Sequence, residues 1–344
     1  MQEKKTSAYI YNELKEAGYA PVRVGETGIY ADLCVDPTLP WILFRADMDA
    51  LPVTEETVLP FASETEGMMH ACGHDAHCAM LLTAAVALKN SSCKQNVRFL
   101  FQPAEEITAG ANVMIDGGAV PPNTVAAFGF HVWPKVPKGK IVAKTGALMA
   151  SSTRIQIDCV GKNAHCSKRY EGADALLTAA RIATRFHEAE AMAENDGTVL
   201  FCGMLHSGAA HNIVSAEAKM VGTLRSYSEQ SRERVLQKLD EIVQESAAEY
   251  GCQAKLSVFS YNPAVINHDA LAEKVQQLLP EAIRSFEPSL ASEDFSRYQH
   301  VVPGVFLWLG VGDTAALHNG KFLVPQEVLP IGVDAWVRLA NHKW

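Results

Sequence analysis

Hydrophobic and polar positions alternate in a helix–strand order along the first part of the chain. Amphipathic segments with helical spacing are followed by short, almost continuous apolar runs, which is typical of buried strands. The expected helices are residues 4–17, ending before Gly18, and residues 78–89; the expected strands are residues 41–45, 97–102 and 126–131. Helices between buried strands predict an α/β/α domain with a mostly parallel sheet.

The pattern changes near residue 150. Residues 154–160 alternate with period two, which indicates a half-exposed antiparallel strand. The elements expected after it are a helix over 173–195, strands over 199–205 and 218–225, a helix over 228–250 and a strand over 255–260. This β-α-β-β-α-β order is typical of a ferredoxin-like fold.

The α/β pattern then resumes with a helix over 269–279 and a buried run over 304–309. We therefore expect one domain from residues 1–149 and 260–344, and a ferredoxin-like α+β domain over 150–259 inserted into it.

Composition narrows the class of function. The chain has 344 residues, with 30 Lys plus Arg against 39 Asp plus Glu and no basic stripe, which argues against nucleic-acid binding. No stretch approaches the roughly 20 apolar residues that span a bilayer, and the N-terminus lacks a signal pattern. We expect a cytoplasmic protein whose eight scattered cysteines are reduced thiols.

Four places carry side chains suited to chemistry. Residues 69–78 hold three histidines, two cysteines and an aspartate, and a Glu-Glu pair at 105–106 follows a buried strand. His131 and His318 each follow a further apolar run. Taken singly, each place has an ordinary interpretation: the first is a polar loop, the second a solvated acidic pair, and the last two are structural histidines. Together, the set is sufficient to bind two zinc-like or manganese-like ions; its members are Cys72, His74, Glu106, His131 and His318.

The chain resembles the M20 metallopeptidase family, in its amidohydrolase branch, subfamily D. That branch includes hippurate hydrolase-like, indoleacetyl-amino-acid hydrolase-like and N-acetyldiaminopimelate deacetylase-like enzymes. The matching segments run in order over nearly the whole chain: RADMDALP (45–52), MHACGHDAH (69–77), FQPAEE (101–106), FGFHVWP (128–134), GALMASS (146–152), VGKNAH (160–165), HNIVS (211–215), GTLRS (222–226), ASEDFS (291–296) and LHN (317–319).

The resemblance implies a metal ligand set. Cys72 resembles the thiolate that bridges two divalent ions. His74 and His131 would complete one site, and Glu106 and His318 the other. Zinc or manganese would suit these ligands, as would cobalt or nickel.

The resemblance also implies catalytic and substrate-binding roles. Glu105 resembles the general base, and Asp47 the carboxylate that orients a ligand imidazole. His165 resembles the histidine that stabilises the carbonyl oxyanion, often across a dimer. Asn212 and Arg225 resemble residues that hold the polar end of the substrate.

These roles imply a metal-dependent amidohydrolase that cleaves small N-acyl amino acids. The inserted domain would act as a lid and would form a homodimer through a sheet edge, either residues 154–160 or a neighbouring strand. A dipeptidase or carboxypeptidase of the wider family is disfavoured, because Arg45 and Cys72 stand where those enzymes carry His and Asp. A non-catalytic metal- or ligand-binding homologue is the remaining alternative, and Glu105 argues against it.

The chain departs from the family pattern in three places. Arg169-Tyr170 stands where members carry a Pro-His pair, and Ser215 stands in place of a proline. Members also usually carry a further helix and a His-x-x-Pro-Glu stretch before the segment matching residues 3–18, and its absence would expose apolar surface.

Overall fold

The computed structural model describes residues 2–91 and 93–344, and the chain divides into two compact units. The first unit comprises the residues up to Leu148 together with Ile266–Glu287 and Asp294–Trp344. The second unit comprises Met149–Val265 and Pro288–Glu293. The insertion expected over residues 150–259 falls inside the second unit.

A seven-stranded mixed sheet forms the centre of the first unit. Its strand order is β1 (Val22–Val24), β2 (Gly28–Leu33), β4 (Asn96–Gln102), β3 (Trp41–Asp47), β5 (Thr124–Pro134), β13 (Gly304–Gly312) and β6 (Ile141–Val142). The four central strands β4, β3, β5 and β13 are parallel, and the outer strands are antiparallel. The structure thus confirms the mostly parallel sheet. Two short strands, β7 (Gly146–Met149) and β12 (Val265–Asn267), pair separately.

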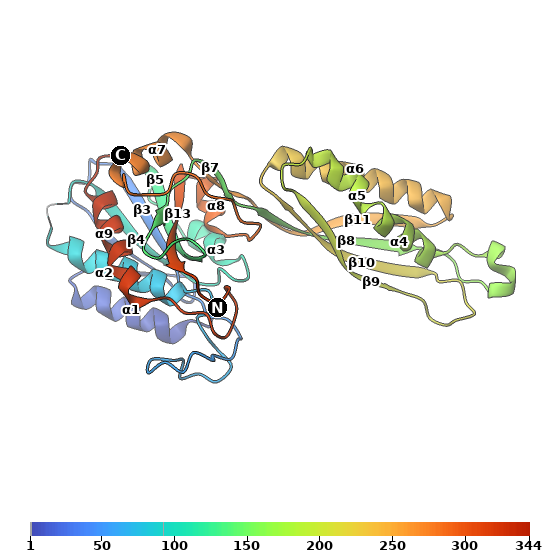
Figure 1. Cartoon of the computed structure of the whole chain (residues 1–344), viewed down its shortest axis with the longest axis horizontal. Coiled ribbons are helices and arrows are strands. Elements are labelled where there is room, and N and C mark those ends of the chain that lie inside the picture. The colour runs from blue at the N-terminus through green and yellow to red at the C-terminus, as the bar shows by residue number, and fades with distance from the viewer. Residues whose placement is uncertain (1, 92) are drawn as a thin grey trace. The chain divides into compact units, whose positions relative to one another are not determined.

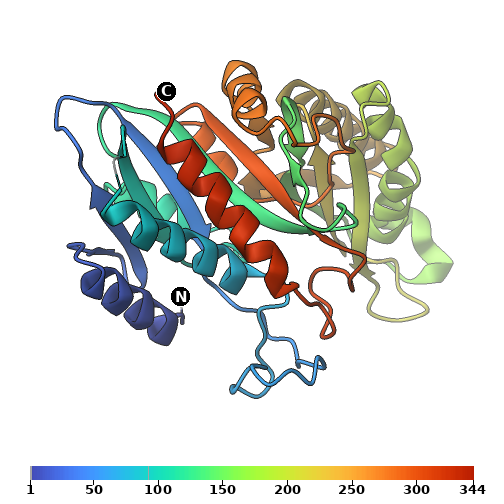
Figure 2. The same cartoon turned by 60° about the vertical axis from the view of Figure 1, so that its left-hand side comes forward.

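Helices cover both faces of this sheet. The red and teal helices of Figure 2, α9 (Leu329–Ala340) and α2 (His74–Lys89), lie side by side across one face, with α1 (Lys4–Glu16) beside α2. The opposite face carries α3 (Gly110–Asp116) and α8 (Phe295–Gln299). The remaining helical segments are α7 (Asp269–Leu278) and the 3-10 turn η3 (Gln326–Val328). None of the helices in residues 2–91 and 93–344 is both long and apolar enough to cross a membrane.

The second unit is a four-stranded antiparallel sheet with helices on one face (Figure 1). The strand order is β11 (Gln253–Asn262), β8 (Ser151–Val160), β10 (Glu217–Ser226) and β9 (Val199–Ser207); the helices are α4 (Ala175–Thr184), α5 (Phe186–Glu190) and α6 (Glu229–Glu249). Ile155, Ile157 and Cys159 alternate along β8 and pack into the core beneath the helices. This is the period-two pattern that the sequence shows.

Two details of the second unit differ from the sequence-based expectation. The helix expected over residues 173–195 is interrupted at Arg185, whose backbone leaves the helical region with φ −104° and ψ 3°. The guanidinium of Arg185 pairs with Glu188 and Glu245. The strand over residues 154–160 cannot be a sheet edge, because β8 is paired on both sides. The two edges of this sheet are β9 and β11.

Candidate metal centre

The predicted ligands gather where the parallel strands of the first unit end. Glu106 lies four residues beyond the end of β4, His131 lies near the end of β5, and His318 follows β13. Cys72 and His74 precede and begin α2, where Gly73 adopts a left-handed conformation with φ 86°. The carboxyl ends of parallel strands are where open α/β sheets form their sites, so residues far apart in the sequence come together here.

Cys72, His74 and His131 form one buried group. Their ligand atoms lie within 4.8 Å of one another, and Cys72 Sγ is 3.4 Å from His131 Nε2. His131 Nδ1 lies 2.6 Å from the carbonyl oxygen of Val132 and donates to it, which leaves Nε2 facing the thiol. Thiol and imidazole groups at this spacing would suit a divalent ion such as zinc.

Cys72, Glu106 and His318 form a second group, again with ligand atoms within 4.8 Å. His318 Nε2 lies 3.4 Å from Glu106 Oε1, and this carboxylate raises the pKa of His318. The backbone N–H of His318 donates to the carbonyl oxygen of Ala71 at 2.7 Å, which ties its loop to the Cys72 loop. The two groups share Cys72, so one sulfur is placed to serve two ions.

The chemistry of these side chains fits a pair of cations. His74 Nε2 is buried and makes no hydrogen bond to any residue in the described part of the chain; the carboxylate oxygens of Asp47 and Glu106 lie 3.8 and 3.9 Å away. A buried polar nitrogen without a partner is costly, and a bound ion would supply that partner. Burial raises the pKa of the Cys72 thiol to about 12, and a bound cation reverses that effect by stabilising the thiolate.

Glu105 lies beside the ligands and is only 7% exposed. Its Oε1 accepts the backbone N–H of Asp294 at 3.3 Å, and it forms a group with His74 and Glu106 whose ligand atoms lie within 4.8 Å. Ala104, directly before it, has φ 53°, a left-handed conformation that non-glycine residues rarely adopt. Such strain is typical of functional sites, and here it turns two adjacent carboxylates toward the same group of residues.

Two aspartates of the first unit support the histidines. Asp49 Oδ1 lies 3.0 Å from His74 Nδ1, while its Oδ2 accepts the backbone N–H of Glu106 at 2.9 Å. Asp47 was expected to orient a ligand imidazole, but its 2.6 Å contact is with Nδ1 of His77. Asp49, two residues further along the chain, therefore makes the contact with a ligand imidazole that was expected of Asp47.

A buried arginine completes the surroundings of Asp47. The Arg45 guanidinium lies 2.7 Å from Asp47 and 2.6 Å from Asp294, and it donates to Gln102 at 2.9 Å. Burial raises the pKa of Asp47, but the charges of His74 and Arg45 outweigh it and hold that pKa well below its usual range. Asp47 is therefore ionised.

Sequence reasoning missed Asp49, His77 and Arg45 as supporting residues. All three lie inside the RADMDALP and MHACGHDAH segments, and the alternation of acids in the first segment was the available signal. Arg45 and Asp47 are two residues apart, but the contacts of Asp49 with His74, His77 with Asp47 and Arg45 with Asp294 span 25, 30 and 249 positions, so these contacts have no local pattern.

The three remaining predicted residues lie in the second unit, at opposite ends of its sheet. His165 bridges Ile213, and the Cys166 N–H donates to the carbonyl oxygen of Asn212, so His165 and Asn212 are neighbours. Both lie beyond Val160 and Glu217, at one end of β8 and β10. Arg225 lies near the other end of β10, eight residues from Glu217, where burial lowers the pKa of its guanidinium.

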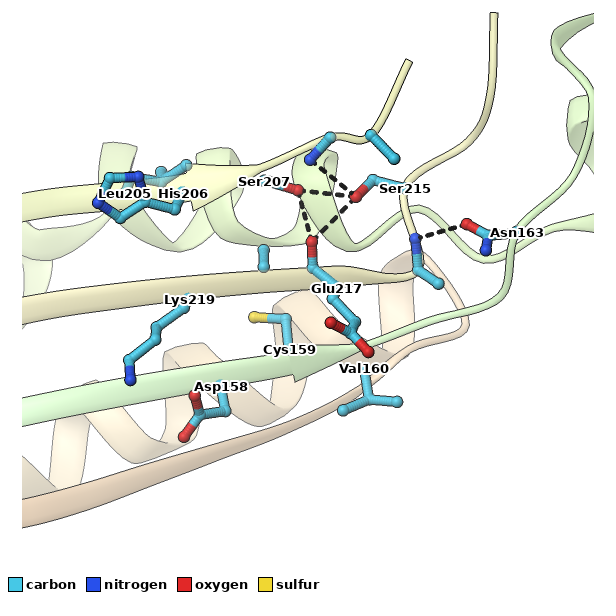
Figure 3. A pocket seen from close by; sticks show the side chains of 14 residues that line it. Asp158, Cys159, Val160, Asn163, Leu205, His206, Ser207, Ser215, Glu217 and Lys219 are labelled. Atoms are coloured by element: carbon cyan, nitrogen blue, oxygen red, sulfur yellow. Dashed lines mark hydrogen bonds between the residues drawn. The ribbon is translucent and has the colours of Figure 1, made fainter.

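The structure explains one departure from the family pattern. Figure 3 shows Ser215 in the hollow beside these loops, where its hydroxyl bonds to Ser207 and accepts the N–H of Gly208. It also donates to the carbonyl oxygen of Glu217, and Asn163 accepts the N–H of Ala216. The hydroxyl thus fixes the loop by hydrogen bonds instead of by a proline ring. Arg169 and Tyr170 lie exposed in the 3-10 segment η1 (Cys166–Glu171), and nothing in the structure explains that substitution.

Comparison with known proteins bears directly on this centre. Residues 43–342 match the family model described as Peptidase family M20/M25/M40. The chain belongs to this family. Among solved structures, a dinuclear metal binding peptidase from the M20 family of Bacillus subtilis superposes with a TM-score of 0.88 at 33% identity, covering 99% of this chain and 92% of that one. The α/β fold and the M20 assignment are thereby confirmed.

Two curated relatives are deacetylases. N-acetylcysteine deacetylase of Bacillus subtilis (strain 168) is 34% identical over 350 residues, spanning 98% of this chain and 91% of the relative. N-acetyldiaminopimelate deacetylase of Bacillus cytotoxicus is 32% identical over 356 residues, spanning 100% of this chain and 93% of the relative. This M20 protein is an amidohydrolase, which confirms the predicted class of enzyme.

Proposed function

We propose that this M20 protein hydrolyses the amide bond of N-acyl amino acids, releasing a carboxylate and a free amino acid with the help of two divalent ions. The observation that carries the proposal is the pair of ligand groups that share Cys72, with Glu105 beside them. The two deacetylase relatives support the substrate class, since both are named for acetylated amino acids.

The proposed ions are zinc or manganese, with cobalt or nickel as further candidates. Cys72 would bridge them, His74 and His131 would hold one, and Glu106 and His318 the other. When bound, such a pair polarises the substrate carbonyl and makes a water molecule more acidic. Asp49 holds His74 Nδ1, and Val132 holds His131 Nδ1, so each imidazole presents Nε2 to its ion.

Glu105 would move the proton. Its carboxylate lies beside both ligand groups, and the Asp294 N–H at 3.3 Å holds its Oε1. Glu105 takes a proton from the attacking water as the carbon–oxygen bond forms, and then gives that proton to the amine nitrogen as the carbon–nitrogen bond breaks. His165 would donate to the carbonyl oxygen as negative charge develops there.

The positions of His165 and Arg225 bear on the assembly. His165 lies beyond the Glu217 end of β10, and Arg225 is eight residues further along that strand. Eight residues of strand span about 26 Å. A small N-acyl amino acid is far shorter than this, so one subunit cannot place both residues on one substrate molecule. We therefore propose that a homodimer builds each site, with His165 and its neighbour Asn212 from one subunit and Arg225 from the other.

The β9 edge is the proposed dimer contact. Val199, Phe201, Met204 and Leu205 are exposed along it, with Phe201 59% exposed. An unpaired apolar edge strand readily pairs with another strand, and natural monomers avoid such edges. A second copy that pairs with β9 would continue the antiparallel sheet and cover these side chains.

Amine release from a panel of N-acyl amino acids tests the proposed function. The panel contains N-acetyl, N-benzoyl and indoleacetyl derivatives, N-acetyldiaminopimelate and several dipeptides, each assayed with added manganese or zinc and again with a chelator. We expect metal-dependent release from N-acyl amino acids and loss of that release with the chelator. Release that resists the chelator contradicts the metal mechanism, and cleavage of dipeptides alone supports the dipeptidase alternative.

A further inference from the structure

His77 lies behind the proposed ligands. Among the buried histidines of the described residues, His74 and His131 are proposed ligands, whereas the mechanism gives His77 no role. It is on α2, one turn after His74, and is 1% exposed. Its ring centre lies 4.6 Å from that of His131 and 5.4 Å from that of His74. Together with Asp47 and His74, it also forms a group whose spacing would allow a metal ion.

The hydrogen bonds of His77 argue against a ligand role. The backbone N–H of Val132 donates to His77 Nε2 at 2.8 Å, so this nitrogen carries the lone pair and the lone pair is already used. The ring proton is therefore on Nδ1, which faces Asp47 Oδ1 at 2.6 Å. With both nitrogens engaged, His77 is a neutral imidazole in one defined tautomer and has no atom left for an ion.

The same backbone residue connects His77 to a proposed ligand. Val132 gives its N–H to His77 and its carbonyl oxygen accepts from His131 Nδ1 at 2.6 Å. The orientation of the His131 ring, with Nε2 toward Cys72, thus depends on the position of Val132. That position depends in turn on His77, which Asp47 holds from its other side.

We propose that His77 is a positioning residue that holds Val132 and thereby orients His131 for metal binding. The inference rests on the proposed function, because it takes His131 as a ligand. Within the closely spaced group of Asp47, His74 and His77, it leaves His74 as a ligand and assigns the other two to support, with Asp47 fixing His77 and His77 fixing the backbone.

Two substitutions separate the two hydrogen bonds of His77. In His77→Gln, the side-chain oxygen can reach the place of Nε2 and accept from Val132, while the bond to Asp47 is lost. In His77→Asn, the amide nitrogen can replace Nδ1 toward Asp47, while the Val132 N–H is left buried without an acceptor. Zinc binding to the metal-free protein is measured by competition with a chromophoric chelator, beside thermal melting of the same metal-free samples.

We expect His77→Asn to weaken binding of one of the two zinc ions by about 10- to 100-fold, as is common when a residue that supports a ligand is lost. His77→Gln is expected to stay closer to the parent affinity. The matched control is Cys78→Ser, which changes the next buried residue of α2; the Cys78 thiol donates to the carbonyl oxygen of Asp47 at 3.0 Å and has no hydrogen bond to Val132. This control is expected to bind both zinc ions like the parent.

Equal zinc affinity in both His77 variants and the parent would overturn the inference. So would an equal loss in both variants that matches an equal loss of melting temperature, because that result indicates packing alone. A parent protein that binds no zinc, manganese or cobalt would instead overturn the proposed function. The two failures are therefore distinguishable.

Discussion

Glu105 and Glu106 are adjacent, yet their surroundings separate their proposed roles. Glu106 lies with Cys72 and His318, whereas Glu105 accepts the Asp294 N–H and borders both ligand groups. One carboxylate is thus placed to bind an ion and the other to move a proton. This division depends on single contacts, so it is best tested at single residues.

Glu105→Gln is expected to keep both metal ions and lose turnover by about two to four orders of magnitude, because an amide cannot accept the proton. Metal content and kcat are measured on the same preparation. The control is Glu106→Gln, which is expected to lose metal as well as activity. Normal turnover in the Glu105 variant contradicts the general-base role.

Cys72→Ser is expected to reduce metal occupancy more than folding stability. The buried hydroxyl is a much weaker ligand than a thiolate, while the change in volume is small. Metal analysis beside thermal melting of the metal-free protein distinguishes the two effects. A variant that retains two ions per chain would exclude Cys72 as the bridge.

Several elements of the first unit meet at one buried ion-pair network. Arg45 on β3 contacts Gln102 at the end of β4 and Asp294 just before α8, and Asp294 also accepts the N–H of Ala111 in α3. The side chains of Arg45, Gln102 and Asp294 are polar and buried away from water. Their mutual hydrogen bonds offset that cost and hold the strand ends that carry the ligands.

Arg45→Met is expected to lower the free energy of unfolding by about 3–5 kcal/mol, because Asp47 and Asp294 are then buried without their cation. Urea unfolding of the metal-free protein measures it. The matched control is Lys138→Met, which removes the exposed pair with Glu327 and is expected to cost far less, because solvent screens that pair. Equal losses in both variants would show that the buried network does not stabilise the strand ends.

At the scale of the whole molecule, the two edges of the second sheet differ in their apolar side chains. Phe201 on β9 and Phe259 on β11 are 59% and 60% exposed, so the two edges can be compared at equally exposed phenylalanines. Phe201 has Val199, Met204 and Leu205 as exposed apolar neighbours along its strand, whereas Phe259 has Val258. This asymmetry favours β9 as the contact between copies.

Phe201→Lys is expected to prevent formation of the proposed dimer, while Phe259→Lys leaves that dimer intact. A lysine on an edge strand opposes strand pairing. Light scattering coupled to size-exclusion chromatography gives the mass of each variant. A dimer that persists in the Phe201 variant and dissociates in the Phe259 variant would move the proposed contact to β11.

A mixture of Glu105→Gln and His165→Ala chains tests whether each site uses two subunits. If His165 serves the partner's site, each mixed dimer contains one site with both residues intact. Random exchange of subunits then restores about a quarter of the parent activity, because half the dimers are mixed and half their sites are complete. Two inactive proteins that stay inactive after exchange would assign His165 to its own subunit.

The sequence by itself determined the chemistry of the centre and the class of fold. Ligand types, their positions after apolar runs and the switch from helical to period-two alternation are local patterns, and they predicted the parallel sheet and the residues that meet at its end. The interruption at Arg185 has no such local signal, and the guanidinium of Arg185 pairs with Glu188 and, on α6, with Glu245.

Only the tertiary structure decided which residues support the ligands and which strands are edges. Asp49 meets His74, Arg45 meets Asp294 and His77 meets Val132 across 25, 249 and 55 positions of the chain. Strand order likewise places β8 inside its sheet and β9 at the edge. Hydrogen bonds and strand pairing join segments that are far apart in the sequence. The hydrophobic periodicity of each segment predicts its own secondary structure but not its partner, so it does not encode these contacts.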